Sequence, residues 1–161
     1  MGGGFLFLLD GITYSGATGW KLLCVEEEAE ELTENSLGES TEETGSGEGV
    51  SVTLLSADNA VKVKLTYYWY PKLPFVRKLL CIYNNTQSEQ CLESVDVENF
   101  AVSEYFAPTF SWIYSDYGRK KSIGPYLGDI QDSLIVIHHP EWEAGIVLGN
   151  EAPGVLKGAS V

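Results

Sequence analysis

The stretch AVKVKLTYYWY, residues 60–70, decides the fold class of this chain. Its residues fall into two alternating sets, Val61, Val63, Leu65, Tyr67 and Trp69 against Lys62, Lys64, Thr66, Tyr68 and Tyr70. Only a β-strand places all five members of the first set on one face, because its side chains alternate with a period of two. The stretch therefore predicts an antiparallel strand with one face in a core.

Similar runs flank this strand. Residues 49–56 and 75–85 are strand-like, and the sequences at 56–59 and 71–74 between them are typical of turns. Further strands are expected at 20–25, 91–106 and 109–116, with a bulge or bend near 98–100, where the apolar alternation changes face. Residues 117–132 are expected to form a loop, and residues 133–140 and 142–151 a closing hairpin.

These runs predict an all-β protein. About eight or nine strands with short connections, and no long helix, favour an antiparallel β-sandwich. The 161 residues are enough for one such domain. The sequence therefore predicts a single sandwich domain over residues 1–161.

The negative charge is concentrated in one segment. The chain has a formal charge of −13, and residues 26–48 hold ten glutamates and no Lys or Arg. A flexible acidic surface loop is the expected structure, with a short helix at 26–32 as the alternative. The chain lacks the basic surface that nucleic acids or anionic membranes require, so neither is expected as a partner.

Targeting signals and cysteine patterns are uninformative. No secretory signal is visible, and no apolar run approaches the ~20 residues of a membrane span, so the compartment stays open. Cys24, Cys81 and Cys91 show no metal-ligand spacing. Cys81 and Cys91 could face each other across a hairpin and form a disulfide, or be two separate thiols.

Few residues are arranged for catalysis. His138 and His139 are adjacent on a predicted strand, so they point to opposite faces and are not expected to bind one metal. Asp96 and Glu98 share a face at a spacing that glycoside hydrolysis could use, although such pairs are common on sheet surfaces. Asp129 and Asp132 form a second acidic pair. No phosphate loop, dinucleotide fingerprint or nucleophile motif is present, so no metal or cofactor is predicted.

Aromatic residues are candidates for carbohydrate binding. Aromatic rings stack on sugar rings, and those with a polar tip suit half-wet surfaces. We single out Trp69, Trp112 and Tyr114 for this role. Packing in the core or between the sheets is the alternative for each of them.

Several short motifs together resemble a known domain. They are YYWYPKLPFVRKLLCIYNN (67–85), VDVENF (95–100), GDIQDSLIVIHH (128–139) and GNEAPGVLKG (149–158). The pattern is similar to the N-terminal β-supersandwich domain of α-galactosidase-like glycoside hydrolases related to family 36. In that family, the resemblance implies, a (β/α)8 barrel carries both catalytic carboxylates. The sandwich packs against this barrel, helps the enzyme to oligomerise and lines part of the substrate pocket. The barrel alone takes about 250 residues, so this chain does not contain it and no catalytic residue is assigned.

The resemblance leads to three functional hypotheses. The first is a non-catalytic accessory sandwich that packs against a following catalytic domain, with Asn150, Glu151 and Lys157 at the domain interface. The alternative for these three residues is that they form hydrogen bonds within the corner at the end of a strand. The second is an independent carbohydrate-binding module. The third is a small stand-alone enzyme that uses His138, His139, Asp96 or Glu98. A homo-oligomer is compatible with each of them.

Overall fold

The computed structural model describes residues 4–17, 19–31, 46–99, 110–114, 121–122, 130–132, 134–139, 143–149 and 157–159. All regular elements among these residues are strands, and all strand pairs are antiparallel. The protein is an all-β antiparallel sandwich, as the sequence predicts. The chain divides into two compact units, residues 1–101 and 102–161. That residues 1–161 form a single domain stays a prediction.

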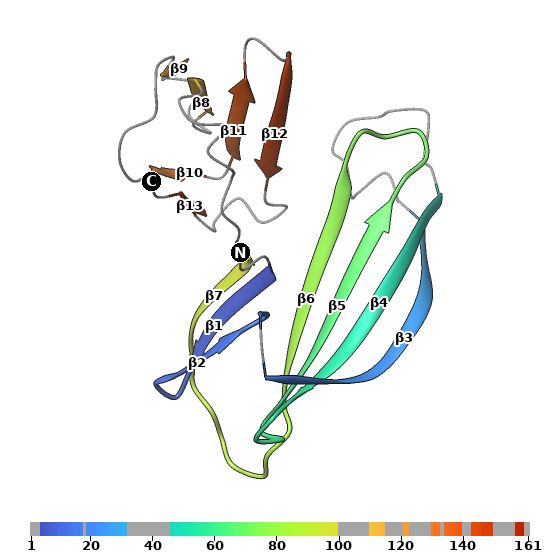
Figure 1. The fold of residues 1–161 in the computed structure, drawn as a ribbon, viewed down its shortest axis with the longest axis vertical. Coiled ribbons are helices and arrows are strands. Elements are labelled where there is room, and N and C mark those ends of the chain that lie inside the picture. The colour runs from blue at the N-terminus through green and yellow to red at the C-terminus, as the bar shows by residue number, and fades with distance from the viewer. Residues whose placement is uncertain are drawn as a thin grey trace. The chain divides into compact units, whose positions relative to one another are not determined.

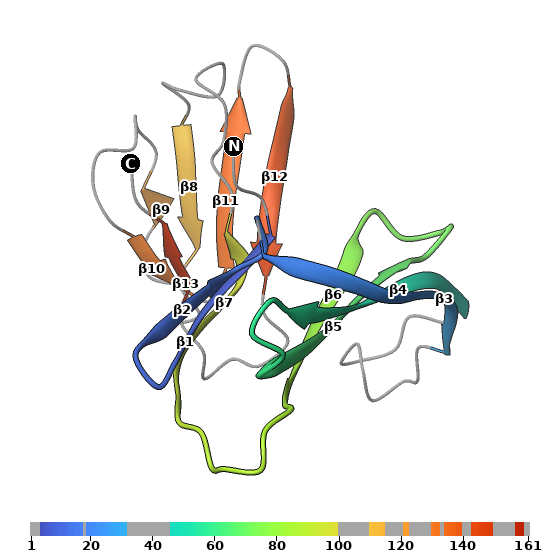
Figure 2. The ribbon, with the colours of Figure 1, turned by 60° about the horizontal axis from the view of Figure 1, so that its bottom comes forward.

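The first unit contains two sheets (Figures 1 and 2). One has the order β2-β1-β7 and the other the order β3-β4-β5-β6. Their strands are β1 (Gly4–Leu9), β2 (Ile12–Ser15), β3 (Trp20–Glu31), β4 (Ser46–Ser56), β5 (Val61–Trp69), β6 (Val76–Asn84) and β7 (Leu92–Asn99). We call them the three-stranded sheet and the four-stranded sheet.

The core of this unit lies between the two sheets. Phe7 is fully buried, and its ring packs against the rings of Phe5, Tyr14 and Trp20. Val61 and Val63 of β5 belong to the same cluster. We call the face of the four-stranded sheet that carries these two valines the inner face, and the opposite side the polar face.

The alternation predicted for residues 60–70 is confirmed where the sheets overlap. Val61 and Val63 are buried while Lys62 and Lys64 are half-buried. At the far end of β5 the burial is reversed, because Trp69 is exposed and Tyr70 is buried. The four-stranded sheet has strands of 9 to 12 residues and the three-stranded sheet has strands of 4 to 8. The buried cluster therefore covers only part of the inner face.

The turn between β4 and β5 ties the two sheets together. Asp58 accepts hydrogen bonds from the Ser56 hydroxyl, from the backbone nitrogen of Ala60 at 3.0 Å and from the Tyr14 hydroxyl at 2.9 Å. These bonds lower the pKa of Asp58, with the Ser56 bond as the largest cause. The turn predicted at 56–59 is thus present, and it fixes β2 against the four-stranded sheet.

The acidic segment differs from its prediction. β3 continues through Glu31 and β4 begins at Ser46, so residues 26–31 and 46–48 are paired strands, with Glu28 opposite Gly49. The prediction of a loop over 26–48 is wrong at both ends, and residues 32–45 lie outside the described residues. The alternative helix at 26–32 is wrong as well, because cross-strand pairing outweighs the helical propensity of glutamate.

The second unit contains two further sheets. One has the order β12-β11-β8-β9 and the other pairs β10 with β13. The strands are β8 (Phe110–Tyr114), β9 (Lys121–Ser122), β10 (Ile130–Asp132), β11 (Leu134–His139), β12 (Ala144–Gly149) and β13 (Lys157–Ala159). β11 and β12 form the predicted closing hairpin. β9 and β10 are short strands within the range for which we predicted a loop.

Two further predictions concern the bend in β7 and the three cysteines. The pairing of β7 with β1 is irregular between Asp96 and Asn99, next to the bend predicted at 98–100. Cys81 and Cys91 are free and exposed, and so is Cys24. The disulfide that the sequence left open is therefore not formed in this structure.

Candidate functional site

The polar face of the four-stranded sheet carries a ladder of ionic contacts. β3 supplies three glutamates two residues apart, and the antiparallel register places β4, β5 and β6 beside them in that order. We define the polar ladder as these glutamates with the side chains that bind them. Its members are Glu26, Glu28, Glu30, Ser51, Lys64, Tyr70 and Arg77.

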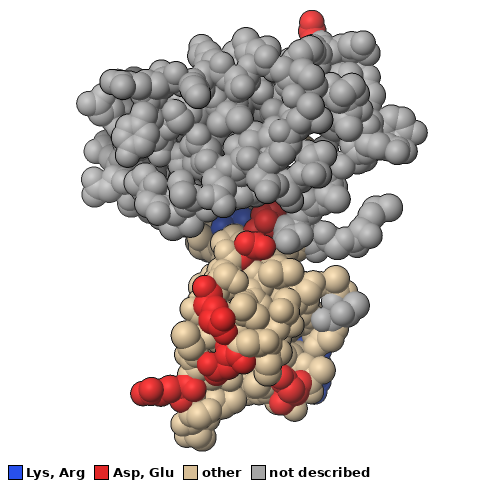
Figure 3. Space-filling view, turned by 90° about the vertical axis from the view of Figure 1, so that its left-hand side faces the viewer, with Lys and Arg blue, Asp and Glu red and all other residues tan. Residues whose placement is uncertain are grey.

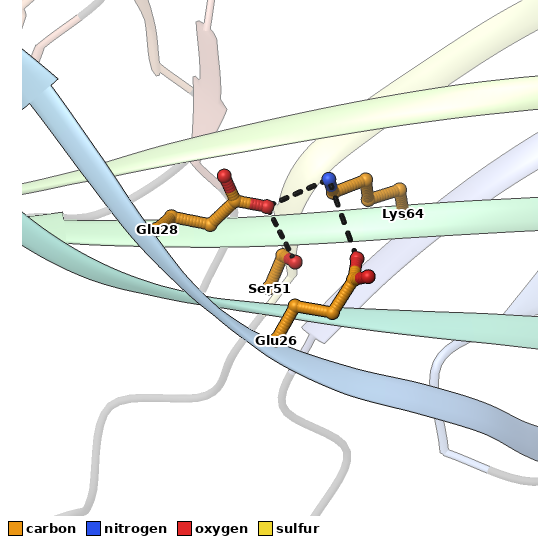
Figure 4. A network of polar contacts seen from close by, with 4 residues as sticks. All are labelled: Glu26, Glu28, Ser51 and Lys64. Atoms are coloured by element: carbon orange, nitrogen blue, oxygen red, sulfur yellow. Dashed lines mark hydrogen bonds and ion pairs between the residues drawn. The ribbon is translucent and has the colours of Figure 1, made fainter.

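Glu28 is at the centre of the first part of the ladder. One of its carboxylate oxygens accepts hydrogen bonds from Lys64 Nζ at 2.7 Å and from Ser51 Oγ at 2.8 Å (Figure 4). Glu26 lies 3.9 Å from the same ammonium group. The Lys64 bond, supported by the Ser51 bond, lowers the pKa of Glu28, and the same contact raises the pKa of Lys64. A carboxylate held ionised in this way is a poor proton donor.

Glu30 is at the centre of the second part. It accepts a hydrogen bond from the Tyr70 hydroxyl at 2.5 Å and pairs with the Arg77 guanidinium. Tyr70 is only 3% exposed. Burial first, and then the bond to Glu30, raises the pKa of Tyr70 to about 12. Glu30 lies in β3, Tyr70 directly follows β5 and Arg77 lies in β6, so these contacts join β3 to strands that are not its neighbours in the sheet.

Small residues on β4 make room for the rings above them. A Cβ atom added to Gly49 would lie 2.5 Å from Tyr68 Cδ1 and 2.8 Å from the backbone oxygen of Tyr67. A Cβ atom on Gly47 would collide with the Tyr70 ring. Both tyrosines therefore lie flat across β4, which allows the hydroxyl group of Tyr70 to reach Glu30 on the next strand.

The predicted carboxylate pair on β7 is not arranged for catalysis. Glu98 Oε2 lies 2.7 Å from Lys78 Nζ, and the Lys78 side chain is only 11% exposed. A carboxyl group that acts in glycoside hydrolysis has to face the substrate. The Glu98 carboxylate is instead in contact with the Lys78 ammonium group. The contact ties β6 to β7, so we interpret it as structural.

The carbohydrate-binding candidates lie in different units. Trp69 ends β5 and is 41% exposed on the inner side, with Glu48 and Val76 opposite it on the neighbouring strands. Trp112 and Tyr114 lie in β8. The structure describes the backbone of β8 but not these two side chains, so their predicted role is not tested.

The remaining candidates lie in the second unit. His138 and His139 are consecutive residues of β11, and Lys157 starts β13 with Asp132 opposite it. Asn150 and Glu151 lie outside the described residues, as does Asp129. The interface role of Asn150, Glu151 and Lys157 therefore stays a prediction. Among the residues that the structure describes, no group of three or more His, Cys, Asp and Glu side chains could hold a metal ion.

Two groups of exposed apolar side chains stand out in the first unit. The first consists of Val76 of β6, Trp69 opposite it at the end of β5, and Val95 and Val97 of β7, with exposed fractions between 39% and 63%; we call it the β6–β7 surface. The second, the β3 edge, consists of Leu22, Leu23 and Val25, each 46% exposed or more. The sequence singled out Trp69, but neither of the two groups as a whole. Strand faces can be predicted from the pattern, but which face lacks a covering layer cannot.

A search of family models, of curated proteins and of solved structures gave no match for this chain. The described residues also include no helix with the length and hydrophobicity needed to cross a membrane.

Proposed function

We propose that this chain is a non-catalytic accessory sandwich of an α-galactosidase-like glycoside hydrolase, and that it packs against a catalytic barrel. The carrying observation is that the first two motifs of the resemblance, residues 67–85 and 95–100, also supply the whole β6–β7 surface. Exposed apolar patches of this kind are typical of surfaces that contact another protein domain. The inference to a sugar enzyme depends on the resemblance of the motifs.

The contacts of the motif residues support a scaffolding role. Tyr70 and Arg77 of the first motif both bind Glu30, and Lys78 binds Glu98 of the second motif. These residues hold strands together, and their polar groups point at protein partners. A motif that served catalysis would be expected to present a carboxyl group with a raised pKa in a cleft.

The charge distribution supports the expectation that nucleic acid is not a partner. In Figure 3, acidic side chains occur in several places on the visible face of the coloured residues, and little basic surface accompanies them. The polar ladder engages Lys64 and Arg77 with glutamates. Phosphate groups would need such cations for themselves.

The test compares this chain with a longer protein. The reading frame downstream of Val161 is expected to encode a (β/α)8 barrel. The longer protein should hydrolyse 4-nitrophenyl α-galactoside, and the 161-residue chain should not. Peptides from β7 should exchange amide hydrogens more slowly in the longer protein, because packing protects them. A downstream sequence without a barrel, or hydrolysis by the short chain, would overturn the proposal.

A matched pair of variants sharpens this test. Val97→Lys places a charge on the β6–β7 surface, and Val25→Lys places one on the β3 edge; both positions are exposed. Val97→Lys should weaken protection of β7 in the longer protein, whereas Val25→Lys should leave it unchanged. Equal effects of both variants would contradict packing through the β6–β7 surface.

A carbohydrate-binding module is the second candidate, and one observation favours it. The exposed Trp69 ring has the exposed carboxylate of Glu48 directly across from it on β4. An aromatic ring for stacking and an acceptor for sugar hydroxyls are the usual components of a sugar site. Titration with galactosides should then show binding in the millimolar range that Trp69→Ala removes. Absence of binding to the wild-type chain would exclude this candidate.

A further inference from the structure

β3 is an edge strand with one unpaired side. It is the last strand of the order β3-β4-β5-β6, and among the described residues only β4 pairs with it (Figure 1). Its first half carries the exposed Leu22, Leu23 and Val25. Its second half, Glu26–Glu31, contains five glutamates. Charged residues on an edge prevent pairing with other strands, so the second half is protected and the first half is not.

We infer that two copies of this chain pair antiparallel through the first halves of their β3 strands, about a two-fold axis at Cys24. The two four-stranded sheets would then form one continuous sheet of eight strands. The contact is isologous, so it closes as a dimer and leaves no further edge of the same kind.

The bulge in β3 selects this register. The pairing of β3 with β4 skips Leu23, so the alternation of side chains between the two faces shifts by one residue at this point. As a result, Lys21 and Glu26 both lie on the polar face, although they are five residues apart. In this dimer Cys24 lies opposite the partner's Cys24. Lys21 is three residues before Cys24 and Glu26 is two residues after it, and the extra residue of the bulge brings Lys21 opposite the partner's Glu26. Without the bulge, the one-residue shift would place these side chains on opposite faces.

The apolar side chains match in the same register. Val25 comes opposite the partner's Leu22 on the inner face, beside the bulge residue Leu23, and the two-fold axis repeats this contact. Cross-strand apolar pairs and the unpaired backbone groups of the edge would provide the stability. All three residues are exposed in the single chain, so the dimer removes apolar surface from water.

Charge separation favours a second copy in this orientation. Glu28 lies four residues past the axis, so at 3.3 Å per residue it is about 26 Å along the strand from the partner's Glu28. That distance exceeds the Debye length of about 8 Å at physiological salt. Parallel, in-register pairing would instead place every glutamate about 4.8 Å from its own copy.

The other edge of the sheet is a poorer partner for β3. β6 carries the cations Arg77 and Lys78, which could face the glutamates of β3 in a head-to-tail assembly. Both cations are already bound within the chain, to Glu30 and Glu98 respectively. Head-to-tail pairing would also continue without closing.

Sedimentation equilibrium of the whole chain over a wide range of concentration tests this inference. We expect a reversible dimer. Val25→Lys should yield a monomer, and at protein concentrations where the wild type is also monomeric both should unfold at the same temperature, because Val25 is already 56% exposed. Val97→Lys, which alters the β6–β7 surface, should leave the dimer intact. A wild-type chain that stays monomeric at all concentrations would overturn the inference, and so would a dimer that Val25→Lys does not weaken.

Charge reversal tests the register itself. Lys21→Glu and Glu26→Lys should each raise the dimer dissociation constant roughly tenfold, because two exposed ion pairs become two like-charge pairs. The double variant should restore the dimer. Glu89→Lys, at an exposed position outside β3, is the control and should have no effect. A double variant as weak as the single ones would contradict the register.

Cysteine crosslinking locates the axis. All three cysteines are exposed, so variants that keep one of them can be compared. A short bismaleimide should crosslink the chain that keeps only Cys24, since the two thiols face each other across the axis. The chain that keeps only Cys81 should stay uncrosslinked. Equal crosslinking through both cysteines would refute a dimer through β3. The result does not depend on the proposed function, because no sugar or barrel enters the measurement.

Discussion

Replacing Tyr70 by Phe should change how the stability of the first unit depends on pH. Tyr70 is buried over Gly47, and its hydroxyl donates to Glu30. Its pKa is raised to about 12 from 10.0, mainly by burial and secondly by the Glu30 bond. The folded protein therefore keeps this proton in a pH range where the unfolded chain has lost it.

The sign and size follow from proton linkage. The stability that the neutral phenol contributes is fully present below pH 10, the unfolded pKa, and is lost as the pH rises towards 12, the folded pKa. One pKa unit corresponds to about 1.36 kcal/mol. Between pH 8 and pH 11 the free energy of unfolding should thus fall by about 1.4 kcal/mol more in the wild type than in Tyr70→Phe.

Urea unfolding at both pH values measures this difference. The Tyr70→Phe variant is the reference, since every other titrating group is present in both proteins. At pH 8 the wild type should be more stable by about 1.5–3 kcal/mol, the range for a hydrogen bond to a charged group. At pH 11 the gap should shrink by the amount given above. Absorbance of the ionised phenol provides a second readout, with one of the nine tyrosines ionising last.

A gap that stays constant from pH 8 to pH 11 would refute the argument. Glu30→Gln separates the two causes of the pKa shift. Because burial is the larger cause, this variant should keep most of the late ionisation of Tyr70. A variant in which Tyr70 titrates like a solvated tyrosine would mean that the Glu30 bond, and not burial, holds the proton.

Three further predictions concern stability. Phe7→Ala should cost about 3–5 kcal/mol in unfolding free energy, because the ring is fully buried, whereas Ile12→Ala at a 55% exposed position should cost far less. Gly49→Ala should destabilise the unit by about 1–3 kcal/mol in urea unfolding, since its Cβ would overlap the Tyr68 ring. Asp58→Asn should remove a stabilising contribution that is present above about pH 4 and lost in more acidic solution, because the Asp58 pKa is lowered in the fold; equal pH dependence of variant and wild type in acid unfolding would contradict it.

Much of the fold could be predicted from local patterns. The alternation in residues 60–70, the turn at 56–59 and the hairpin at 133–151 each depend on neighbours in sequence, and each was correct. The extent of the core was not predictable in the same way. Trp69 continues the apolar set of β5, yet it is exposed, because the strands that would have to cover it are shorter than β5.

The polar ladder was not predicted from the sequence. The sequence directed attention to histidines and to carboxylate pairs, whereas the structure binds Glu98 to Lys78 and arranges the polar ladder around Glu28 and Glu30. One signal could have indicated the ladder. Glu26, Glu28 and Glu30 alternate in sequence, and a period of two is compatible with a strand as well as with a loop.

The error in the acidic segment has a physical origin that reaches beyond this chain. The neighbours in sequence of the glutamates at 26–31 are other glutamates and no cations, so their mutual repulsion favours an open loop. In the sheet the nearest cations come from Lys64 and Arg77, which are more than thirty residues away along the chain. Gly47 then allows the Tyr70 ring to cross β4, so that its hydroxyl group reaches Glu30. A strand can therefore tolerate a run of like charges when other strands supply the opposite charges on the same face. It follows that replacing Lys64 or Arg77 should loosen the second half of β3, although neither residue belongs to that strand.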